Sequence, residues 1–227
     1  MITVACVFWG NKFSLDYVYN LRNMVKRNTT VDHEFVCFSD KQIPDVKTHI
    51  LKPGFNGWWN KLQMFNTEYP LRQNVVYFDL DTLITNNIDW LMQYNTMFMG
   101  IEDLGSVNAH QPFLRGQLQS GVLKWNRAMN GHIWQEFTAR PDVMIKIRGD
   151  GEYLNIVLPN EKRELLQRVF PHKLKSYKYQ VYDTGLDDNT SIVCFHGRPS
   201  IVESMTETVK TSMNTYKPQA WVQEHWR

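Results

Sequence analysis

Two aspartates at the end of an apolar stretch are the residues of this sequence best suited to chemistry. Asp79 and Asp81 follow the apolar run 75–78 and are separated only by Leu80. Alternate side chains of an extended chain point to the same side, so the two carboxylates would face one ligand from Cα atoms roughly 6.5–7 Å apart. Their hard oxygen atoms suit Mg²⁺ or Mn²⁺ better than a structural zinc. The pair predicts a divalent metal site, although a bare Asp-x-Asp is also common as a capping and turn sequence.

Other polar residues follow apolar stretches or lie in glycine-rich turns. Asp103 and His196 each end an apolar run, Asp150 lies in the turn Gly-Asp-Gly, and Lys61 follows two tryptophans. Ligands of open α/β sheets bind at the carboxyl ends of the strands, where such residues gather. Each also has an ordinary structural explanation, as a turn residue, a helix cap, a structural histidine or a solvated lysine. Alone, none of them indicates a function.

Strands that alternate with helices must position these residues. The β-branched and apolar runs predict strands at 3–7, 34–39, 47–51, 74–79, 97–102, 121–125 and 191–195. Helical patterns lie at 15–26, where Ser14 is the expected cap, and at 58–65, 133–138, 153–157, 161–169 and 201–210. This order predicts an α/β fold with a mixed sheet flanked by helices, mostly parallel in its N-terminal half. No linker or repeat divides the chain, so residues 1–200 are expected to form one domain and residues 201–227 a helical tail packed on it.

The composition excludes several classes of function. The chain has 227 residues with a formal net charge of +2, which does not indicate a nucleic-acid binder. The apolar start at residues 2–9 is too short to span a bilayer, and no basic leader precedes it. The three cysteines, Cys6, Cys37 and Cys194, lie in strand-like runs and are expected to be free core residues. Together these features predict a protein of a reducing compartment, the cytoplasm, without a transmembrane segment.

The run Phe78-Asp79-Leu80-Asp81-Thr82-Leu83 resembles the D-x-D motif of GT-A-fold glycosyltransferases, especially the glycogenin-like retaining group (family 8 type). Further resemblances follow in the family's order over residues 2–200, with the tail not covered. They are the loop 8–11, the K-L segment 58–62, the stretch 119–122 similar to N-S-G-V, the stretch 149–155 similar to D-Q-x-x-L-N, and the H-G turn 196–197. Two positions depart from the motifs: Gln119 stands in the Asn position, and Gly151 stands in the Gln position.

The resemblance implies a Rossmann-like GT-A domain that moves a hexose-type sugar from a nucleoside-diphosphate sugar, UDP-linked in the family's manner, to a glycan or other hydroxyl acceptor with retention. It implies Mn²⁺ or Mg²⁺ held by Asp79, Asp81 and His196. It places Asp103, Asp150 and Glu152 at the reacting sugar. The implied donor-binding residues are Phe8, Trp9, Asn11, Tyr17, Lys61, Asp79, Leu80, Gln119, Ser120, Gly121, Gly197 and Arg198. Arg198 is expected to contact the diphosphate, because Ser200 stands where the family often has Lys.

Three alternatives remain open from the sequence. A haloacid-dehalogenase-like phosphatase uses D-x-D-G-T, which residues 79–83 approach without the glycine, and Asp187 and Asp188 would imitate its later acidic motif. That nucleophile strand normally opens the fold, whereas about seventy residues precede it here. A non-catalytic sugar-binding protein would also explain the aromatic content and the altered Gln position. Finally, Lys173, Lys175 and Lys178 form a basic patch that suits a membrane contact, a solvated strand face or an acceptor surface.

Overall fold

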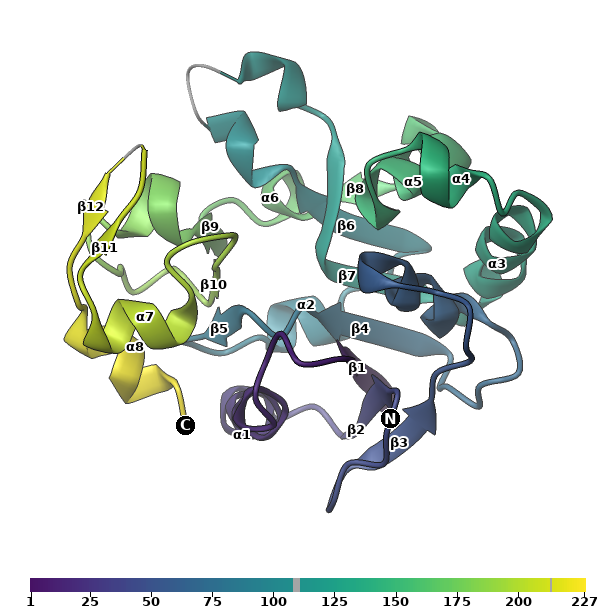
Figure 1. The fold of residues 1–227 in the computed structure, drawn as a ribbon, viewed down its shortest axis with the longest axis horizontal. Helices are drawn as coiled ribbons and strands as arrows, with labels where there is room; N and C mark the ends of the chain where they lie inside the picture. Colours follow the sequence, from purple (N-terminus) through teal and green to yellow (C-terminus); the bar gives the residue numbers. More distant parts are fainter. Residues whose placement is uncertain (108–110, 213) are drawn as a thin grey trace.

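The structure is a computed structural model, and it describes residues 1–107, 111–212 and 214–227. A central sheet of seven strands lies between two layers of helices (Figure 1). Its strand order is β3-β2-β1-β4-β7-β6-β8. The strands are β1 Ile2–Phe8, β2 His33–Ser39, β3 Lys47–Ile50, β4 Asn74–Phe78, β6 Phe98–Glu102, β7 Leu118–Asn126 and β8 Glu164–Leu165. The first four in sequence order are parallel, and β7 runs antiparallel to β4 and β6, which confirms the predicted mixed α/β sheet.

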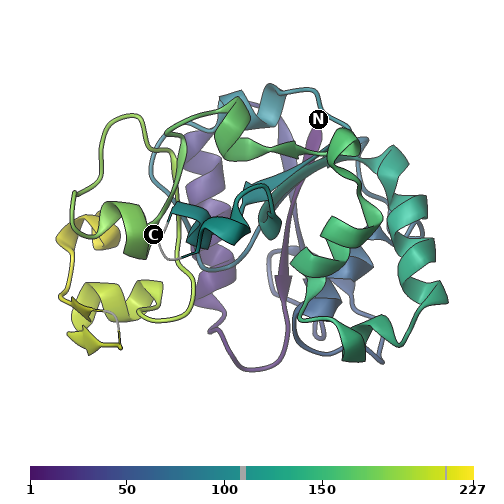
Figure 2. The ribbon, with the colours of Figure 1, turned by 90° about the horizontal axis from the view of Figure 1, so that it is seen from above.

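Strand β1 is buried along its whole length because both faces of the sheet are covered. Val4, Cys6 and Phe8 belong to the core beneath helix α1 (Asp16–Asn28), whereas Ala5 and Val7 belong to the core on the other face. That second layer contains the 3₁₀ helix η1 (Gly57–Phe65), α3 (Asn130–Ala139) and α5 (Asp150–Val157). Figure 2 shows α1 and the α3–α5 region on opposite sides of the sheet. Continuous apolar runs are typical of strands covered on both faces.

A second sheet extends the structure beyond β4. Its order is β5-β10-β9, formed by β5 (Thr82–Ile84), β9 (Leu174–Ser176) and β10 (Ile192–Cys194). Strand β10 runs antiparallel to β5 and parallel to β9. Because β5 begins four residues after β4 ends, the chain passes from the large sheet to the small one through residues 79–81. The acidic pair therefore lies at the junction of the two sheets.

The remaining elements are short. They are α2 (Asp89–Gln93), η2 (Leu104–Val107), η3 (Pro112–Leu114), η4 (Arg127–Met129), α4 (Val143–Lys146), η5 (Asn160–Lys162), α6 (Leu166–Val169), the π-helical turn η6 (Tyr177–Val181), α7 (Ile201–Thr206), the β11–β12 pair (Val209–Lys210 and Thr215–Tyr216) and α8 (Ala220–His225). None of the helices formed by the described residues is both long and apolar enough to cross a membrane.

The residues that follow α8 lie near α1 at the C-terminal end of the ribbon in Figure 1. The Trp226 ring meets Tyr17 edge-on with centroids 4.8 Å apart, and Arg27 Nη2 of α1 donates to the carbonyl oxygen of His225 at 2.9 Å. Trp226 is 8% exposed. The end of the chain thus completes the apolar layer that covers α1.

The structure corrects five local predictions. Helix α1 begins at Asp16 with Leu15 as its N-cap, so Ser14 does not cap it and instead donates to the Asp16 carboxylate. The predicted helix 161–169 is divided into η5, β8 and α6, because residues 164–165 pair with β6. The predicted helix 201–210 ends at Thr206, since residues 209–210 pair with β12. Strand β7 begins at Leu118 rather than at residue 121, and β4 ends at Phe78.

The three cysteines are free and buried, as the sequence predicts. Cys6 and Cys37 are neighbours across the parallel pair β1–β2. Burial raises the pKa of the Cys6 and Cys194 thiols well above the ordinary value. Both therefore remain protonated core groups, not nucleophiles.

Candidate functional site

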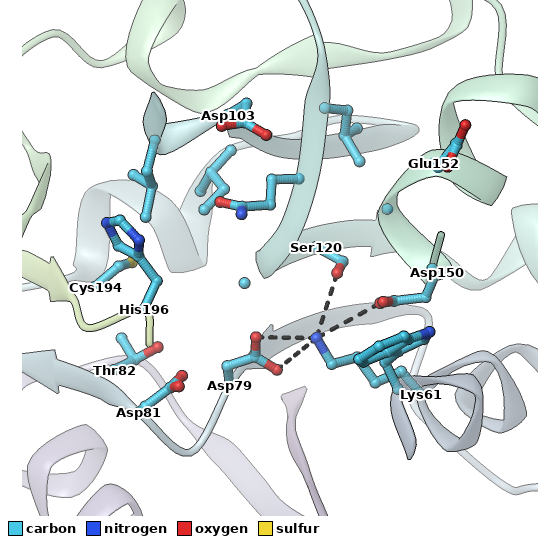
Figure 3. A pocket seen from close by; sticks show the side chains of 18 of the residues that line it. Lys61, Asp79, Asp81, Thr82, Asp103, Ser120, Asp150, Glu152, Cys194 and His196 are labelled. Atoms are coloured by element: carbon cyan, nitrogen blue, oxygen red, sulfur yellow. Dashed lines mark hydrogen bonds and ion pairs between the residues drawn. The ribbon is translucent and has the colours of Figure 1, made fainter. Parts of the chain in front are cut away.

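The acidic pair lies in a tight turn and not in a strand. The backbone N–H of Asp79 donates to Gly121 O of β7 at 2.8 Å, and the N–H of Thr82 donates back to Asp79 O at 3.1 Å, which closes the turn. Leu80, between the two acids, is 3% exposed and packs in the core. With Leu80 anchored, Asp79 and Asp81 both face a cleft (Figure 3). The predicted orientation is therefore found, although the turn produces it instead of the two-residue period of a strand.

Strand pairing in the small sheet brings His196 to the same place. Cys194 of β10 is paired with Thr82 of β5, and the backbone N–H of Phe195 donates to Asp81 O at 3.0 Å. His196 comes one residue later and lines the cleft beside the acidic turn (Figure 3). Residues more than a hundred positions apart in the sequence are thus placed together by one antiparallel pair.

The cleft has a volume of about 1130 Å³ and runs along the carboxyl ends of β1 and β4. Of the 17 site residues that the sequence predicts, 13 line it, and those with polar side chains are Lys61, Asp79, Asp81, Asp103, Gln119, Ser120, Asp150, Glu152 and His196. Its rim carries aromatic side chains: Trp9 is 38% exposed, Trp58 53% and Phe113 70%. A site of this size with apolar walls and convergent polar groups is typical of a small-molecule binding site.

Lys61 is the centre of the charge network in the cleft (Figure 3). Its Nζ lies 2.7 Å from Asp79 Oδ1, 3.5 Å from Asp150 Oδ2 and 3.3 Å from Ser120 Oγ. Burial alone would lower the pKa of Lys61, but the charges of Asp150 and Asp79 raise it above its ordinary value. Tyr77 donates a hydrogen bond to Asp79 Oδ1. Lys61 is therefore a fixed cation that neutralises Asp79 in the structure.

Asp81 and His196 have different electrostatic surroundings. Burial, and then the nearby charge of Asp79, raises the pKa of Asp81 to about 7. Burial, and then the charge of Lys178, lowers the pKa of His196 to about 4, so its imidazole is neutral near pH 7. His196 Nε2 forms a hydrogen bond of 2.8 Å with Ser176 Oγ, which fixes the ring. A neutral imidazole is the form that can bind a metal.

Helix α5 and strand β7 position the other end of the cleft. Asn155 accepts from the Leu118 N–H at 3.0 Å and donates to Leu118 O at 2.7 Å, so its amide holds α5 against the strand. Asp150, in the first turn of α5, is 6% exposed, and its Oδ2 accepts no hydrogen bond from the described residues, although the Lys61 ammonium lies 3.5 Å away as its ion-pair partner. Gln119 Oε1 is buried without a hydrogen-bond partner among them. These two acceptor oxygens can take hydrogen bonds from a bound ligand.

The two positions that depart from the family motifs lie against each other. A Cβ atom on Gly151 would be 3.7 Å from Cα of Gln119 and 3.7 Å from the Ser120 nitrogen, which is ordinary contact distance. A side chain at position 151 would therefore occupy space in front of β7 that is open in this chain. Glu152 accepts from the Arg148 N–H at 2.8 Å at the rim, and Asp103 Oδ1 accepts from the Gly105 N–H at 2.8 Å.

Four residues predicted at the site do not line the cleft. Phe8 is 3% exposed and Tyr17 is 6% exposed, and both belong to the core under α1. Asn11 is exposed and lies outside the cleft. Arg198 forms an ion pair with Glu203, whose carboxylate is part of the capping box of α7, and this pairing holds the guanidinium away from the cleft. Sequence order alone did not reveal that the chain turns at Arg198.

The structure adds Lys12 to the cleft, a residue that the sequence did not single out. Asn155, from the motif stretch 149–155, also lines the cleft, and Lys178 of the basic patch lies beside it at Gly197. The basic patch that contains Lys178 is divided, because Lys175 of the edge strand β9 forms an ion pair with Asp187. Neither Asp187 nor Asp188 lines the cleft, so the second acidic motif that the phosphatase alternative needs is not at the acidic pair.

Solved structures share this fold. The galactosyltransferase LgtC, solved in complex with donor and acceptor sugar analogues, aligns with a TM-score of 0.66 and 12% identity over 88% of this chain and 89% of LgtC. The glycosyltransferase GlyE of Streptococcus pneumoniae aligns with a TM-score of 0.63 and 12% identity over 88% of this chain and 55% of GlyE. The bifunctional glycosyltransferase WbbM gives 0.60 and 10% over 88% of this chain and 46% of WbbM. No protein-family model and no curated protein matches the sequence. The chain therefore has the GT-A fold of these glycosyltransferases, as its sequence motifs predict.

Proposed function

We propose that this chain is a metal-dependent glycosyltransferase. It moves a hexose-type sugar from a nucleoside-diphosphate sugar, with UDP as the nucleotide, to a hydroxyl of a glycan or another acceptor, with retention of configuration. The observation that carries the proposal is the convergence of Asp79, Asp81 and His196 on one cleft of a GT-A fold. LgtC, solved with donor and acceptor sugar analogues, supports the class of substrate. The free, buried cysteines support the cytoplasm as its location.

The residues of the acidic turn fit a divalent cation by their chemistry. Two carboxylates and a neutral imidazole face the cleft together, and a cation would balance the negative charge that Asp81 adds beside Asp79. Among the described residues, however, no three such groups are already arranged around one point. Asp79 is paired with Lys61, and His196 is bonded to Ser176. Mn²⁺ or Mg²⁺, held by Asp79, Asp81 and His196, would supply positive charge to the leaving diphosphate.

The chain's own residues would bind and orient the sugar. Asp150 Oδ2 and Gln119 Oε1 offer two buried acceptors to sugar hydroxyls, and Asp103 and Glu152 offer carboxylates on either side. The Lys61 ammonium, which already lies between Asp79 and Asp150, keeps the sugar end of the cleft from being strongly negative. Positioning of this kind converts binding energy into a lower barrier for the transfer step.

A thermal-shift screen of nucleotide sugars in the presence of Mn²⁺ tests the proposal. A donor at 100 times its dissociation constant should stabilise the folded protein by about 2.7 kcal/mol. Turnover with a panel of hydroxyl acceptors should follow, and the anomeric proton of the product, observed by NMR, should report retention. Inversion would contradict the retaining mechanism, and donor binding without turnover over the whole panel would favour the sugar-binding alternative.

The metal requirement has its own test. The double variant Asp79→Asn, Asp81→Asn, if folded, should lose donor turnover by at least 100-fold, on the order of the loss expected when charge stabilisation of a leaving group is removed. The wild type in excess chelator should show a comparable loss that added Mn²⁺ reverses. Full turnover of the folded double variant in excess chelator would show that no ion takes part.

A further inference from the structure

The cations around the cleft are almost all engaged with acids. Lys61 is paired with Asp79 and Asp150, and Arg148 is paired with Glu152. Arg198, which the sequence placed at the diphosphate, is paired with Glu203 outside the cleft. A nucleoside diphosphate carries two to three negative charges and needs a free cation in addition to a metal ion. The engaged cations do not provide one, whereas Lys12 in the cleft and Lys178 beside it form no ion pair among the described residues.

Lys178 meets that need by its position. Its Nζ lies 3.5 Å from the point where a Cβ of Gly197 would be, and Gly197 lines the cleft directly after His196. Gly197 has a φ of +71°, a conformation that glycine adopts without strain, and the turn lies within ordinary contact distance of the ammonium group. No ion pair joins Lys178 to an acid among the residues that the structure describes.

The local structure fixes Lys178 at this place. It lies in the π-helical turn η6, which is capped by Ser176, whose Oγ accepts from the Tyr179 N–H at 3.2 Å. The same Oγ is bonded to His196 at 2.8 Å. One hydroxyl therefore holds both the turn that carries Lys178 and the ring of His196. Across the acidic turn, Lys12 lines the cleft from the β1–α1 loop.

We propose that Lys178 is the phosphate-binding cation of this cleft, whose ammonium group binds the phosphate oxygens of the donor's nucleoside diphosphate beside Gly197. This inference rests on the proposed function and adds a residue to it. Lys178 replaces Arg198 in the role that sequence order suggested. An ammonium at this place offsets the repulsion between the diphosphate and the carboxylates of Asp79 and Asp81.

Calorimetric titration of the full chain with UDP and Mn²⁺, and in parallel with uridine, tests the inference. The Lys178→Gln variant should raise the Kd for UDP by about 10- to 100-fold, as expected for losing a bond between charged groups. It should leave the Kd for uridine, which has no phosphate, unchanged. Lys178→Arg should keep UDP binding within a few fold of the wild type. Arg198→Gln is the matched control and should change neither Kd more than twofold.

Each outcome decides the question. Equal UDP binding by the wild type and Lys178→Gln would overturn the inference, because it would show that Lys178 does not contact the phosphates. An equal loss of affinity for UDP and for uridine would also overturn it, because it would show a general disturbance of the site. A strong loss in Arg198→Gln alone would return the role to that residue. If Lys178→Gln does not fold, the comparison is made with Lys178→Met. If the wild type binds none of UDP, GDP, ADP and CDP, the proposed function itself fails. That outcome differs from UDP binding that is intact in the wild type and unchanged in Lys178→Gln, which contradicts only the inference about Lys178.

Discussion

Lys61 and Asp79 form a close ion pair in the cleft. The side chains are 16% and 25% exposed, so the pair is largely removed from water, and both oxygens of Asp79 lie within 3 Å of the ammonium. A metal ion that binds Asp79 must share this carboxylate with Lys61 or displace it. The two cations therefore compete for one anion.

The variant Lys61→Met should expose this competition. Removing the ammonium leaves Asp79 and Asp150 as neighbouring acids without their cation, and the free energy of unfolding should fall by about 3 kcal/mol. Mn²⁺ should then restore part of the loss, so the metal-induced rise in Tm should be larger in the variant than in the wild type. Calorimetric melting with and without Mn²⁺ measures both quantities.

Lys52→Met is the matched control, because Lys52 pairs with Glu68 at the surface, where the side chains are 47% and 67% exposed. The unfolding free energy of this variant should change by less than about 1 kcal/mol. Its metal-induced rise in Tm should equal that of the wild type. An equal metal-induced rise in Lys61→Met and the wild type would show that Lys61 and the metal do not share Asp79.

At the scale of elements, the pairing of β5 with β10 assembles the site. The sequence predicts a strand before each of the functional groups, because continuous apolar runs identify β4 and β10 clearly. It does not predict that β4 stops at Phe78 and that a second sheet starts at Thr82, since the turn at 79–81 is closed by backbone hydrogen bonds that no residue pattern reports. The sequence likewise did not predict that Arg198 pairs with Glu203, because that partner lies in the capping box of α7.

Asp89 joins two helices, and its removal should weaken the fold in a pH-dependent way. Its carboxylate accepts hydrogen bonds from Thr29 Oγ1, from the Thr30 N–H at 2.9 Å and from Thr30 Oγ1 at 2.6 Å, tying the end of α1 to the start of α2. Burial opposes the shift, but the hydrogen bonds, those of Thr29 first, lower the pKa of Asp89 below its ordinary value of 3.8. The folded state therefore favours the ionised form.

Asp89→Asn should destabilise the protein by about 2 kcal/mol near pH 7. The pKa of Asp89 is lower in the folded than in the unfolded protein, so its contribution to stability is complete at pH values above the unfolded pKa of 3.8. This contribution is lost as the pH falls through 3.8 toward the pKa of the folded state. The gap in urea midpoint between the wild type and the variant should thus shrink from pH 6 to pH 3. Asp188 is exposed, so the control variant Asp188→Asn should show no such gap in urea midpoint. A gap for Asp89→Asn that stays constant with pH would contradict the linkage between the pKa of Asp89 and stability.

At the scale of the whole molecule, the sequence predicted the class of fold and a tail packed on the domain, but not the residues through which the tail makes contact. Alternating apolar runs and helical periods define the layers, and the family motifs define the order of the cleft segments. Contacts between the ends of the chain leave no such pattern. Phe8 and Tyr17 were expected at the donor, yet they support α1, and Tyr17 packs against Trp226, 209 positions later. An aromatic residue on a helix serves the core or a ligand equally well by sequence.

Trp226 provides the test of that contact. It is 8% exposed against Tyr17, and Arg27 donates to the carbonyl oxygen of the adjacent His225. Trp226→Ala should lower the free energy of unfolding by about 3 kcal/mol, the lower end for a buried tryptophan, and the Tm by about 6–12 °C. Trp58→Ala is the matched control, since Trp58 lines the cleft and is 53% exposed, and its Tm should stay within about 2 °C of the wild type. Equal melting of Trp226→Ala and the wild type would mean that residues 201–227 add no stability to the sheet and helices that they cover.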